Sequence, residues 1–366
     1  MIELATELRW QDRRFRVPME RILLSERLGY DAVFSPEGFG SEVLVPLGYL
    51  AAQTKHLKLG TRILQVTGRP PAIAISAYQT LNHITGGGRL IAGLGSGTPM
   101  QREGFEGRPW GNPVKRMRDY VSLLRQGFAG QPLNHQGEEW SAPYRGPGNK
   151  GIEPLTLGLE PISPIPIMIA AAHPQMTALA AEIGEGWMPP SWAPGVMHAF
   201  KPMLEKGFAR AGNGKSPADF KIWAHVDCVV NDNVRAAMRP FKEYTVHWAH
   251  LQREIMEARG YKDLADRLRE LFDPEKDATS MQAGGHVLEG NRWEEAINAV
   301  PDEYVDDGWL VGPVMRIKER VKAWFDCGLT GLIVRYGDPF SHERMEEPLE
   351  LFTAVAQAAG KVPRSV

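Results

Sequence analysis

Two loops of small residues follow two apolar segments, and both have the composition of a surface that contacts a flat ligand. The first segment ends in Arg62-Ile63-Leu64-Gln65, and the second ends in Gly95-Ser96-Gly97-Thr98. The second loop has neither the spacing of a phosphate-binding P-loop nor the full spacing of a dinucleotide fingerprint. In isolation it is equally well explained as a tight turn that needs glycine. Its pairing with the first loop favours a ligand site.

A third turn, Ala171-Ala172-His173-Pro174, has the composition of an anion site. Pro174 fits the first turn of a helix, where free peptide N–H groups and the helix dipole favour an anion such as a phosphate. The alternative is an ordinary turn between a strand and a helix. His173 precedes a proline and is therefore held extended, so its side chain need not contact a ligand.

Two glutamates are the candidates for proton transfer. Glu37 and Glu103 both follow apolar segments, and burial of either carboxyl group would raise its pKa toward neutrality. The alternative is that both are ordinary solvated side chains. Weaker candidates are two further acidic and three basic residues: Glu7, Asp227, Arg62, Arg69 and Arg335. The arginines could bind an acidic cofactor or form surface ion pairs.

The elements that position these residues alternate between short apolar runs and segments of helical period, which indicates a parallel sheet with crossover helices. The eight expected strands are residues 2–6, 30–34, 57–63, 90–94, 165–171, 186–188, 220–230 and 329–335. Helices are expected at 18–28, 45–54, 113–128, 175–183, 234–272 and 314–325, and in a segment whose inner face is Ile73, Ala77, Leu81 and Ile84. Eight such units predict an α/β fold, a (β/α)₈ TIM barrel, because closing the sheet removes both edges.

The whole chain, 1–366, is interpreted as a single domain with two insertions. The Gly- and Pro-rich segment 130–164 is expected to lie against the mouth of the barrel. The helical segment 234–300 is expected at the periphery, as a lid or a partner surface, and it ends in a polar, Gly-containing stretch. Substrate specificity is expected to reside in these two segments.

Composition excludes several classes of function. A net charge of −2 and a pI near 6.6 provide no basic surface for nucleic acid. No apolar run reaches membrane-spanning length and no signal peptide is expected, so the protein is interpreted as cytoplasmic. Cys228 and Cys327 lack metal-ligand spacing and are expected to be small buried side chains. No metal site is expected.

Four blocks of the sequence resemble the luciferase-like monooxygenase superfamily, and within it the deazaflavin (coenzyme F420)-dependent oxidoreductases are the most similar. The blocks are LGTRILQVTGRPPAIAISAYQTLNHITGGGRLIAGLGSG, TPMQREGFEGRPWGNPVKRMRDYVSLLRQ, IPIMIAAAHPQMTALAAEIGEGWMP and VGPVMRIKERVKAWFDCGLTGLIVRYG. The resemblance implies that the cofactor ring lies against a bulge at the end of the third strand, with a cis peptide between Arg62 and Ile63. It further implies that residues 95–98 follow the ring or its ribityl chain and that residues 171–174 donate backbone N–H groups to the phosphate.

The resemblance implies hydride transfer between F420 and a small organic substrate, in a homodimer. Two alternatives stay open: a monooxygenase that uses reduced FMN, and a flavin-binding barrel without catalysis. Relatives that oxidise alcohols have an acidic residue and a histidine after the second strand, whereas this chain has Pro36-Glu37 there without a histidine. Relatives also usually have glycine where this chain has His173. These departures disfavour alcohol oxidation and leave reduction of an activated double bond, carbonyl or imine.

Overall fold

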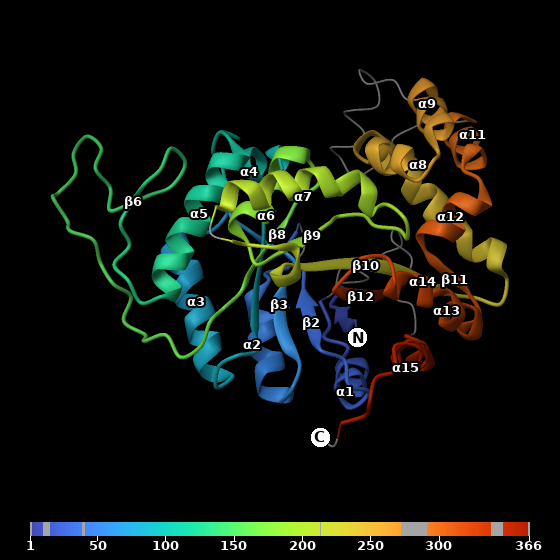
Figure 1. The fold of residues 1–366 in the computed structure, drawn as a ribbon, viewed down its shortest axis with the longest axis horizontal. Coiled ribbons are helices and arrows are strands. Elements are labelled where there is room, and N and C mark those ends of the chain that lie inside the picture. The colour runs from blue at the N-terminus through green and yellow to red at the C-terminus, as the bar shows by residue number, and fades with distance from the viewer. Residues whose placement is uncertain are drawn as a thin grey trace.

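The computed structural model describes residues 2–9, 15–38, 41–212, 214–271, 291–337 and 347–364. Eight parallel strands form a closed barrel, because β9 pairs with β10 and β12 pairs with β1 (Figure 1). In order around the barrel they are β1 (Glu3–Glu7), β2 (Ala32–Ser35), β3 (Lys58–Thr61), β5 (Leu90–Gly95), β8 (Ile167–Ala170), β9 (Gly186–Met188), β10 (Lys221–Val230) and β12 (Gly331–Tyr336). Each overlaps an expected strand, so the predicted (β/α)₈ barrel is confirmed. Two further short strands pair with strands of this ring: β4 (Leu64–Gln65) with β5, and β11 (Leu310–Gly312) with β10.

Helices surround the barrel as the crossover connections require (Figure 1). They are α1 (Met19–Arg27), α2 (Leu44–Gln53), α3 (Pro71–Ile84), α5 (Pro113–Phe128), α6 (Pro174–Ile183), α7 (Met197–Ala211), α13 (Val314–Arg320), α14 (Lys322–Phe325) and α15 (Leu349–Ala358). Helix α5 begins as expected, since the Asn112 side chain accepts hydrogen bonds from the N–H groups of Val114 and Lys115. The sequence pattern did not predict α7, α15, the short helix α4 (Pro99–Gly104) or the 3₁₀ turn η1 (Pro217–Asp219).

The expected inner face of α3 is wrong at both of its ends. Ile73 is 58% exposed and Ile84 is 60% exposed. The buried face of this helix instead carries Ala74, Ile75 and Tyr78. A run of apolar residues on a helix fits more than one stripe of period 3.6, and here the stripe with the large tyrosine side chain faces the barrel.

Apolar side chains from different strands fill the barrel interior as one cluster. Its buried members are Ala5, Ala32, Phe34, Ile91, Met168, Met188, Trp223 and Ile333. Two glycines make room for the large rings. A Cβ atom on Gly60 would lie 2.3 Å from Phe34, and one on Gly331 would lie 2.3 Å from Trp223. The lower part of the barrel is therefore a packed core, which leaves the carboxyl-terminal mouth for chemistry.

The first insertion does not lie against the mouth of the barrel, so that expectation is wrong. Its hairpin of β6 (His135–Gln136) and β7 (Ser141–Ala142) runs along the outside of α5, where Asp119 accepts hydrogen bonds from His135 Nε2 and from the backbone N–H of Glu139, both at 2.9 Å. The segment then returns past the turn before β5, where Ser163 Oγ accepts a hydrogen bond from the Gly88 N–H. In Figure 1 it extends away from the barrel on the side of α3 and α5. Most of this segment is exposed, including Pro147, Pro161 and Pro164.

The second insertion forms a cap with an apolar cluster of its own. It contains α8 (Val234–Ala258), α9 (Lys262–Leu271), α11 (Asn291–Ala299) and α12 (Asp302–Gly308), which gather beside β11 (Figure 1). The expected single helix over 234–272 is wrong, because Gly260, with φ +84°, ends α8. The N–H groups of Gly260 and Tyr261 bond back to Glu257 and Met256, as a glycine-terminated helix requires. The polar end of the expected segment lies in 272–290, outside the described residues.

Among the described residues, every helix is too short or too polar to cross a membrane.

Candidate functional site

The three loops predicted to bind a ligand lie side by side at the carboxyl edge of the barrel. They follow β3, β5 and β8, which are neighbours in the sheet. Leu64 pairs with Leu94, and Leu94 pairs with Ile169, so the loops leave the sheet at one level. The peptide bond between Arg62 and Ile63 is cis, as the resemblance implies. The structure therefore brings residues 62–65, 95–98 and 171–174 to one rim.

Close packing joins the first two loops. Ile63 lies over Gly95, where a Cβ atom would come within 2.4 Å of Ile63 Cδ1. Gly97 has φ +71°, and a Cβ atom there would lie 2.9 Å from Thr67 Oγ1. That hydroxyl oxygen is buried and has no hydrogen-bond partner among the described residues. A cradle that only glycine permits, beside an unsatisfied polar atom, fits a planar polar ligand such as a flavin or deazaflavin.

The rest of the second loop is ordered by a helix. The half-buried Ser96 hydroxyl donates a 3.4 Å hydrogen bond to the Gly97 carbonyl oxygen. Thr98 is the N-cap of α4, and it exchanges side-chain and backbone hydrogen bonds with Gln101. This capping fixes the direction in which the chain leaves the loop, and it does not occupy the exposed edge of the loop.

The third loop presents the amino terminus of α6. Ala171 is buried, and its carbonyl oxygen accepts a 2.8 Å hydrogen bond from Trp187 Nε1. Ala172, His173 and Pro174 are exposed, and the His173 side chain forms no cap hydrogen bond. The first helical bond runs from the Thr177 N–H to the His173 carbonyl oxygen, so the preceding N–H groups have no helical partner and can bind an anion. The exceptions are Ala171, whose N–H donates to the Met188 carbonyl oxygen at 3.4 Å, and Pro174, which has no N–H.

The two glutamates have different environments. The Glu37 carboxylate accepts hydrogen bonds from the Gln65 N–H at 2.6 Å and from Arg69 Nη2 at 3.2 Å. Burial raises the pKa of Glu37, although these hydrogen bonds and the Arg69 charge oppose the shift. Glu103 is exposed on α4 and accepts a 3.3 Å hydrogen bond from the Trp110 N–H. The structure thus places Glu37 against the first loop and Glu103 on the outer surface.

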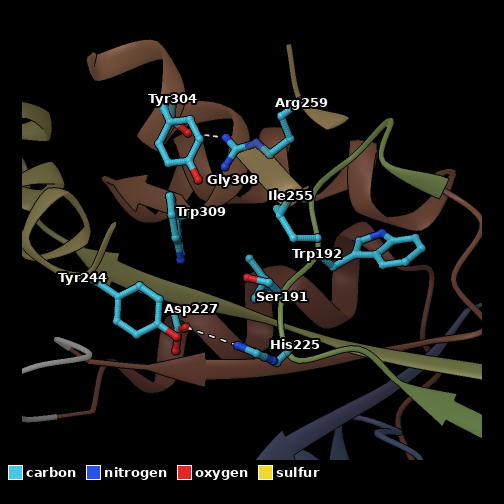
Figure 2. Close-up of a pocket in the computed structure, with 11 residues that line it drawn as sticks. Ser191, Trp192, His225, Asp227, Tyr244, Ile255, Arg259, Tyr304, Gly308 and Trp309 are labelled. Atoms are coloured by element: carbon cyan, nitrogen blue, oxygen red, sulfur yellow. Dashed lines mark hydrogen bonds and ion pairs between the residues drawn. The ribbon is translucent and has the colours of Figure 1, made fainter. Parts of the chain in front are cut away.

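A small pocket lies between the mouth and the cap (Figure 2). We call it the cap pocket. It has a volume of about 10 Å³ and is lined by Ser191, Trp192, His225, Val226, Asp227, Tyr244, Ile255, Arg259, Tyr304, Gly308 and Trp309. In Figure 2, Arg259 and Tyr304 occupy its cap side, while His225 and Asp227 occupy its barrel side. The second insertion therefore borders the site, as expected for a specificity element.

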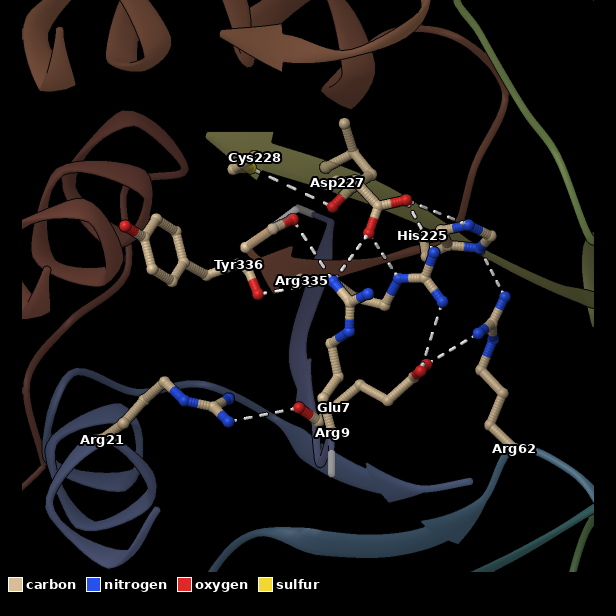
Figure 3. A network of polar contacts seen from close by, with 11 residues as sticks. Glu7, Arg9, Arg21, Arg62, His225, Asp227, Cys228, Arg335 and Tyr336 are labelled. Carbon is tan, nitrogen blue, oxygen red and sulfur yellow. Dashed lines mark hydrogen bonds and ion pairs between the residues drawn. The ribbon is translucent and has the colours of Figure 1, made fainter. Parts of the chain in front are cut away.

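Charged side chains form a layer directly above the apolar barrel core (Figure 3). Glu7 Oε2 accepts a 2.7 Å hydrogen bond from Arg62, and Asp227 accepts two from Arg335, at 2.8 and 2.6 Å. Arg335 also lies 3.4 Å from Glu7, which links the two pairs. The weaker sequence candidates are thus mutually paired in the mouth instead of forming surface ion pairs. Among them only Arg69 lies elsewhere, beside Glu37.

The sequence reasoning missed two members of this layer: Arg9, whose Nη1 atom lies 3.6 Å from Asp227 Oδ1, and His225. The His225 Nδ1 atom contacts Arg62, and its Nε2 atom lies 3.7 Å from Asp227 Oδ2. Burial, and then the surrounding arginines, lower the pKa of His225 well below its ordinary 6.5, so the ring is neutral. The strand itself contained a signal. Trp223, His225 and Asp227 alternate along β10 and share its inward face, so two polar residues on that face of an otherwise apolar strand mark a functional layer.

The described residues contain no group of three or more histidine, cysteine, aspartate or glutamate side chains arranged to hold a metal ion. The arrangement at the mouth is instead one of backbone donors, glycine cradles and paired charges. Such a site can orient a planar cofactor and exclude water, while the redox chemistry belongs to the cofactor.

Comparison with known proteins agrees with this architecture. A putative coenzyme F420-dependent oxidoreductase of Mycobacterium tuberculosis is 31% identical over 331 residues, which cover 87% of this chain and 90% of that protein. The 5,10-methylenetetrahydromethanopterin reductase of Archaeoglobus fulgidus is 27% identical over 346 residues, 94% of each. The solved coenzyme F420-dependent tetrahydromethanopterin reductase from Methanopyrus kandleri superposes over 98% of both chains, with a TM-score of 0.72 and 19% identity. The model of the luciferase-like monooxygenases matches residues 6–331, and the chain belongs to that family.

Proposed function

We propose that this protein is an oxidoreductase that transfers a hydride between coenzyme F420 and a small organic substrate. The observation that carries the proposal is the meeting of three loops at one rim, with a glycine cradle at Gly97 and free N–H groups at the start of α6. Relatives named as F420-dependent support the choice of cofactor. The family name supports the alternative, a monooxygenase that uses reduced FMN.

In this proposal each loop binds one part of the cofactor. The cis peptide between Arg62 and Ile63 would hold the ring, the 95–98 loop would hold its edge and ribityl chain, and the N–H groups of Ala172 and His173 would bind the phosphate. The bound deazaflavin supplies or accepts the hydride. The protein orients the reacting carbon, and the mutually paired charges of Arg62, Asp227 and Arg335 lie beneath the rim.

We assign proton transfer to Glu37. Its Oε2 atom accepts a 2.6 Å hydrogen bond from the Gln65 N–H, and its Oε1 atom accepts a longer one, at 3.2 Å, from Arg69 Nη2, so we place the proton on Oε1, the oxygen with the longer contact. The raised pKa keeps more of the acid protonated than a solvated glutamate would be. Glu37→Gln should therefore lower turnover and flatten its fall with rising pH, while Glu103→Gln, at an exposed position, should do neither. Loss of the pH dependence in the Glu103 variant instead would transfer the role to that residue.

Reconstitution decides the cofactor. Purified protein is mixed with F420 or FMN, and binding is followed by the absorption of the ring and activity by hydride transfer or oxygen consumption. We expect binding of F420 and no oxygen consumption. FMN binding with substrate-dependent oxygen uptake would establish the monooxygenase. FMN binding without turnover of any kind would instead indicate a non-catalytic flavin-binding barrel.

A matched pair of glycine variants tests the site. Gly97→Ala places a methyl group against Thr67 at φ +71° and should abolish ring binding. Gly86→Ala carries the same backbone strain, at φ +73°, in the turn before β5, where a Cβ atom meets nothing within 4 Å. This control should bind the cofactor as the wild type does. Equal binding by both variants would contradict the proposed placement.

We also propose a homodimer formed through α2 and α3, which pack side by side. Each presents apolar side chains to solvent: Val45 and Tyr49 from α2, and Ile73 and Ile84 from α3. Light scattering after size exclusion should give twice the chain mass, and Ile73→Glu should give a monomer. A monomeric wild type at micromolar concentration would refute this interface.

A cytoplasmic location is proposed on the state of the thiols. Cys228 is buried and Cys327 half-buried, and both are free. Fractionation of cells that express the protein, followed by immunoblotting, tests the location.

A further inference from the structure

A chain of polar side chains crosses the mouth of the barrel and ends at the first loop of the rim. Arg62, which follows β3, donates a 2.7 Å hydrogen bond from Nη1 to Glu7 of β1, and its Nη2 atom contacts His225 Nδ1 of β10. Figure 3 shows the Arg62 guanidinium between these two partners. In the order of strands around the barrel, β3 and β10 are four positions apart in either direction. The contact between Arg62 and His225 therefore joins opposite sides of the barrel.

This contact determines which nitrogen of His225 carries the proton. A guanidinium group has only N–H donors, so Nδ1 must be the acceptor and carries no proton. The neutral ring then has its proton on Nε2, which lies 3.7 Å from Asp227 Oδ2. Burial, and then the charges of Arg335, Arg62 and Arg9, lower the pKa of the ring, in agreement with this neutral form.

A neutral acceptor suits the charges around position 225. Among the described residues, the charged and titratable groups around His225 come from β1, β10 and β12, from the loops after β1 and β3, and from α8: they are Glu7, Arg9, Arg62, Asp227, Arg335 and Tyr244. Both carboxylates in this group already pair with an arginine. The neutral ring binds Arg62 without adding a charge. A protonated ring would place a further positive charge among the arginines and could not accept the hydrogen bond.

Arg62 also begins the first loop, residues 62–65, and its side chain anchors that loop inside the barrel. The side chain is only 10% exposed. The next residue, Ile63, lies over Gly95 of the second loop. The position of the guanidinium and the packing of the two loops therefore depend on the same short segment of backbone.

We propose that His225 is a positioning residue of the cofactor site: through Nδ1 it holds the Arg62 guanidinium against Glu7, and Arg62 thereby holds the first loop in the form that receives the cofactor. In this role His225 acts through Arg62 and exchanges neither a proton nor a hydride. The effect on cofactor binding rests on the proposed function, whereas the contact between the two side chains does not. Because a proton on Nδ1 would remove the acceptor, the position of Arg62 depends on pH.

A matched pair of substitutions tests this role through cofactor affinity. Glutamine retains a neutral oxygen that can accept from Arg62, whereas leucine fills similar space without an acceptor. Binding of F420, and separately of FMN, is measured at pH 7.5 by the absorption of the ring. Affinity should fall about tenfold in His225→Leu and should stay within about threefold of the wild type in His225→Gln. His198→Gln, at an exposed position of α7, is the control and should bind as the wild type does.

Two further measurements separate positioning from packing. The affinity of the wild type should be constant above pH 6.5 and should fall as pH decreases toward the folded pKa of His225, because the protonated ring cannot accept from Arg62. This fall should be smaller in His225→Gln, which has no ring to protonate. Nitrogen-15 NMR of histidine-labelled protein, with the His225 signals identified by their absence from His225→Gln, should show a proton on Nε2 and none on Nδ1.

Failure of this inference is distinguishable from failure of the proposed function. Wild-type affinity in His225→Leu, equal affinity of the leucine and glutamine variants, or a proton on Nδ1 would overturn the inference. If His225→Leu does not fold, the pH profiles of the wild type and His225→Gln, together with the NMR measurement, decide the question.

If neither F420 nor FMN binds, the proposed function fails, and urea unfolding of Arg62→Met, His225→Leu and the double variant tests the contact alone. The effect of the double variant on the unfolding equilibrium constant should be about tenfold smaller than the product of the two single effects, because either substitution already breaks the contact. Independent effects of the two substitutions would overturn the positioning of Arg62 by His225.

Discussion

The buried pair of Asp227 and Arg335 offers a quantitative test of the charged layer. The Asp227 side chain is 1% exposed and accepts both of its short hydrogen bonds from Arg335. In Asp227→Asn, one carboxylate oxygen becomes an NH₂ group that faces the donors of Arg335. The variant therefore removes the charge and places a donor against a donor. Among the described acidic residues, Glu7, 3.4 Å from Arg335, then remains to compensate the guanidinium.

The expected cost is large because the remaining charge stays buried. Removal of one partner of a buried ion pair typically costs about 3–5 kcal/mol of the free energy of unfolding. Loss of an exposed pair costs about 0–1 kcal/mol. The surface pair of Arg239 and Glu294, which are 51% and 54% exposed, provides that comparison through Glu294→Gln. The double variant Asp227→Leu/Arg335→Met removes both charges and should cost less than Asp227→Asn alone.

Urea unfolding followed by far-ultraviolet circular dichroism measures these differences, with refolding checked by dilution. All four proteins are measured at pH 7 and equal concentration, because a dimer would make the midpoint depend on concentration. A loss below about 1 kcal/mol in Asp227→Asn, or a larger loss in the double variant than in the single one, would refute the reasoning that this layer is an interdependent buried network.

Two further predictions concern the layer and the rim. The folded-state pKa of His225 lies below its ordinary 6.5, so the stability that the neutral ring contributes is present above pH 6.5 and is lost as pH falls toward the folded value. Between pH 7.5 and about 5.5, His225→Gln should lose less free energy of unfolding than the wild type. The control, His198→Gln at an exposed position, should follow the wild type. Parallel curves of unfolding free energy against pH for all three proteins would argue against a neutral buried ring. Gly95→Ala forces a methyl group to within 2.4 Å of Ile63 and should cost about 1–3 kcal/mol of stability in urea unfolding, together with cofactor affinity. Gly104→Ala, which meets nothing within 4 Å, should change stability by less than about 0.5 kcal/mol, so equal losses would show that packing at the rim is not tight.

The periodicity of apolar residues in the sequence predicted the barrel. Strands such as β9 (Gly186–Met188) and β5 (Leu90–Gly95) were predictable because strands buried on both faces must be short and apolar. Because residues that follow barrel strands lie at the carboxyl-terminal mouth, the sequence alone places the 95–98 loop and Glu37 there. The sequence is sufficient to predict strands and the loops that follow them, because the residues that form each of these elements are neighbours in the chain.

Only the tertiary structure decided which distant side chains meet. The pairing of Asp227 with Arg335 and the contact of His225 with Arg62 join residues more than a hundred positions apart. It also decided that the first insertion packs on α5 while the second covers the mouth, because a loop's destination depends on the surface that accepts its side chains. The composition of a segment does not reveal that surface. For this reason the side chains that line the cap pocket, Arg259 among them, could be identified as neighbours only from the tertiary structure.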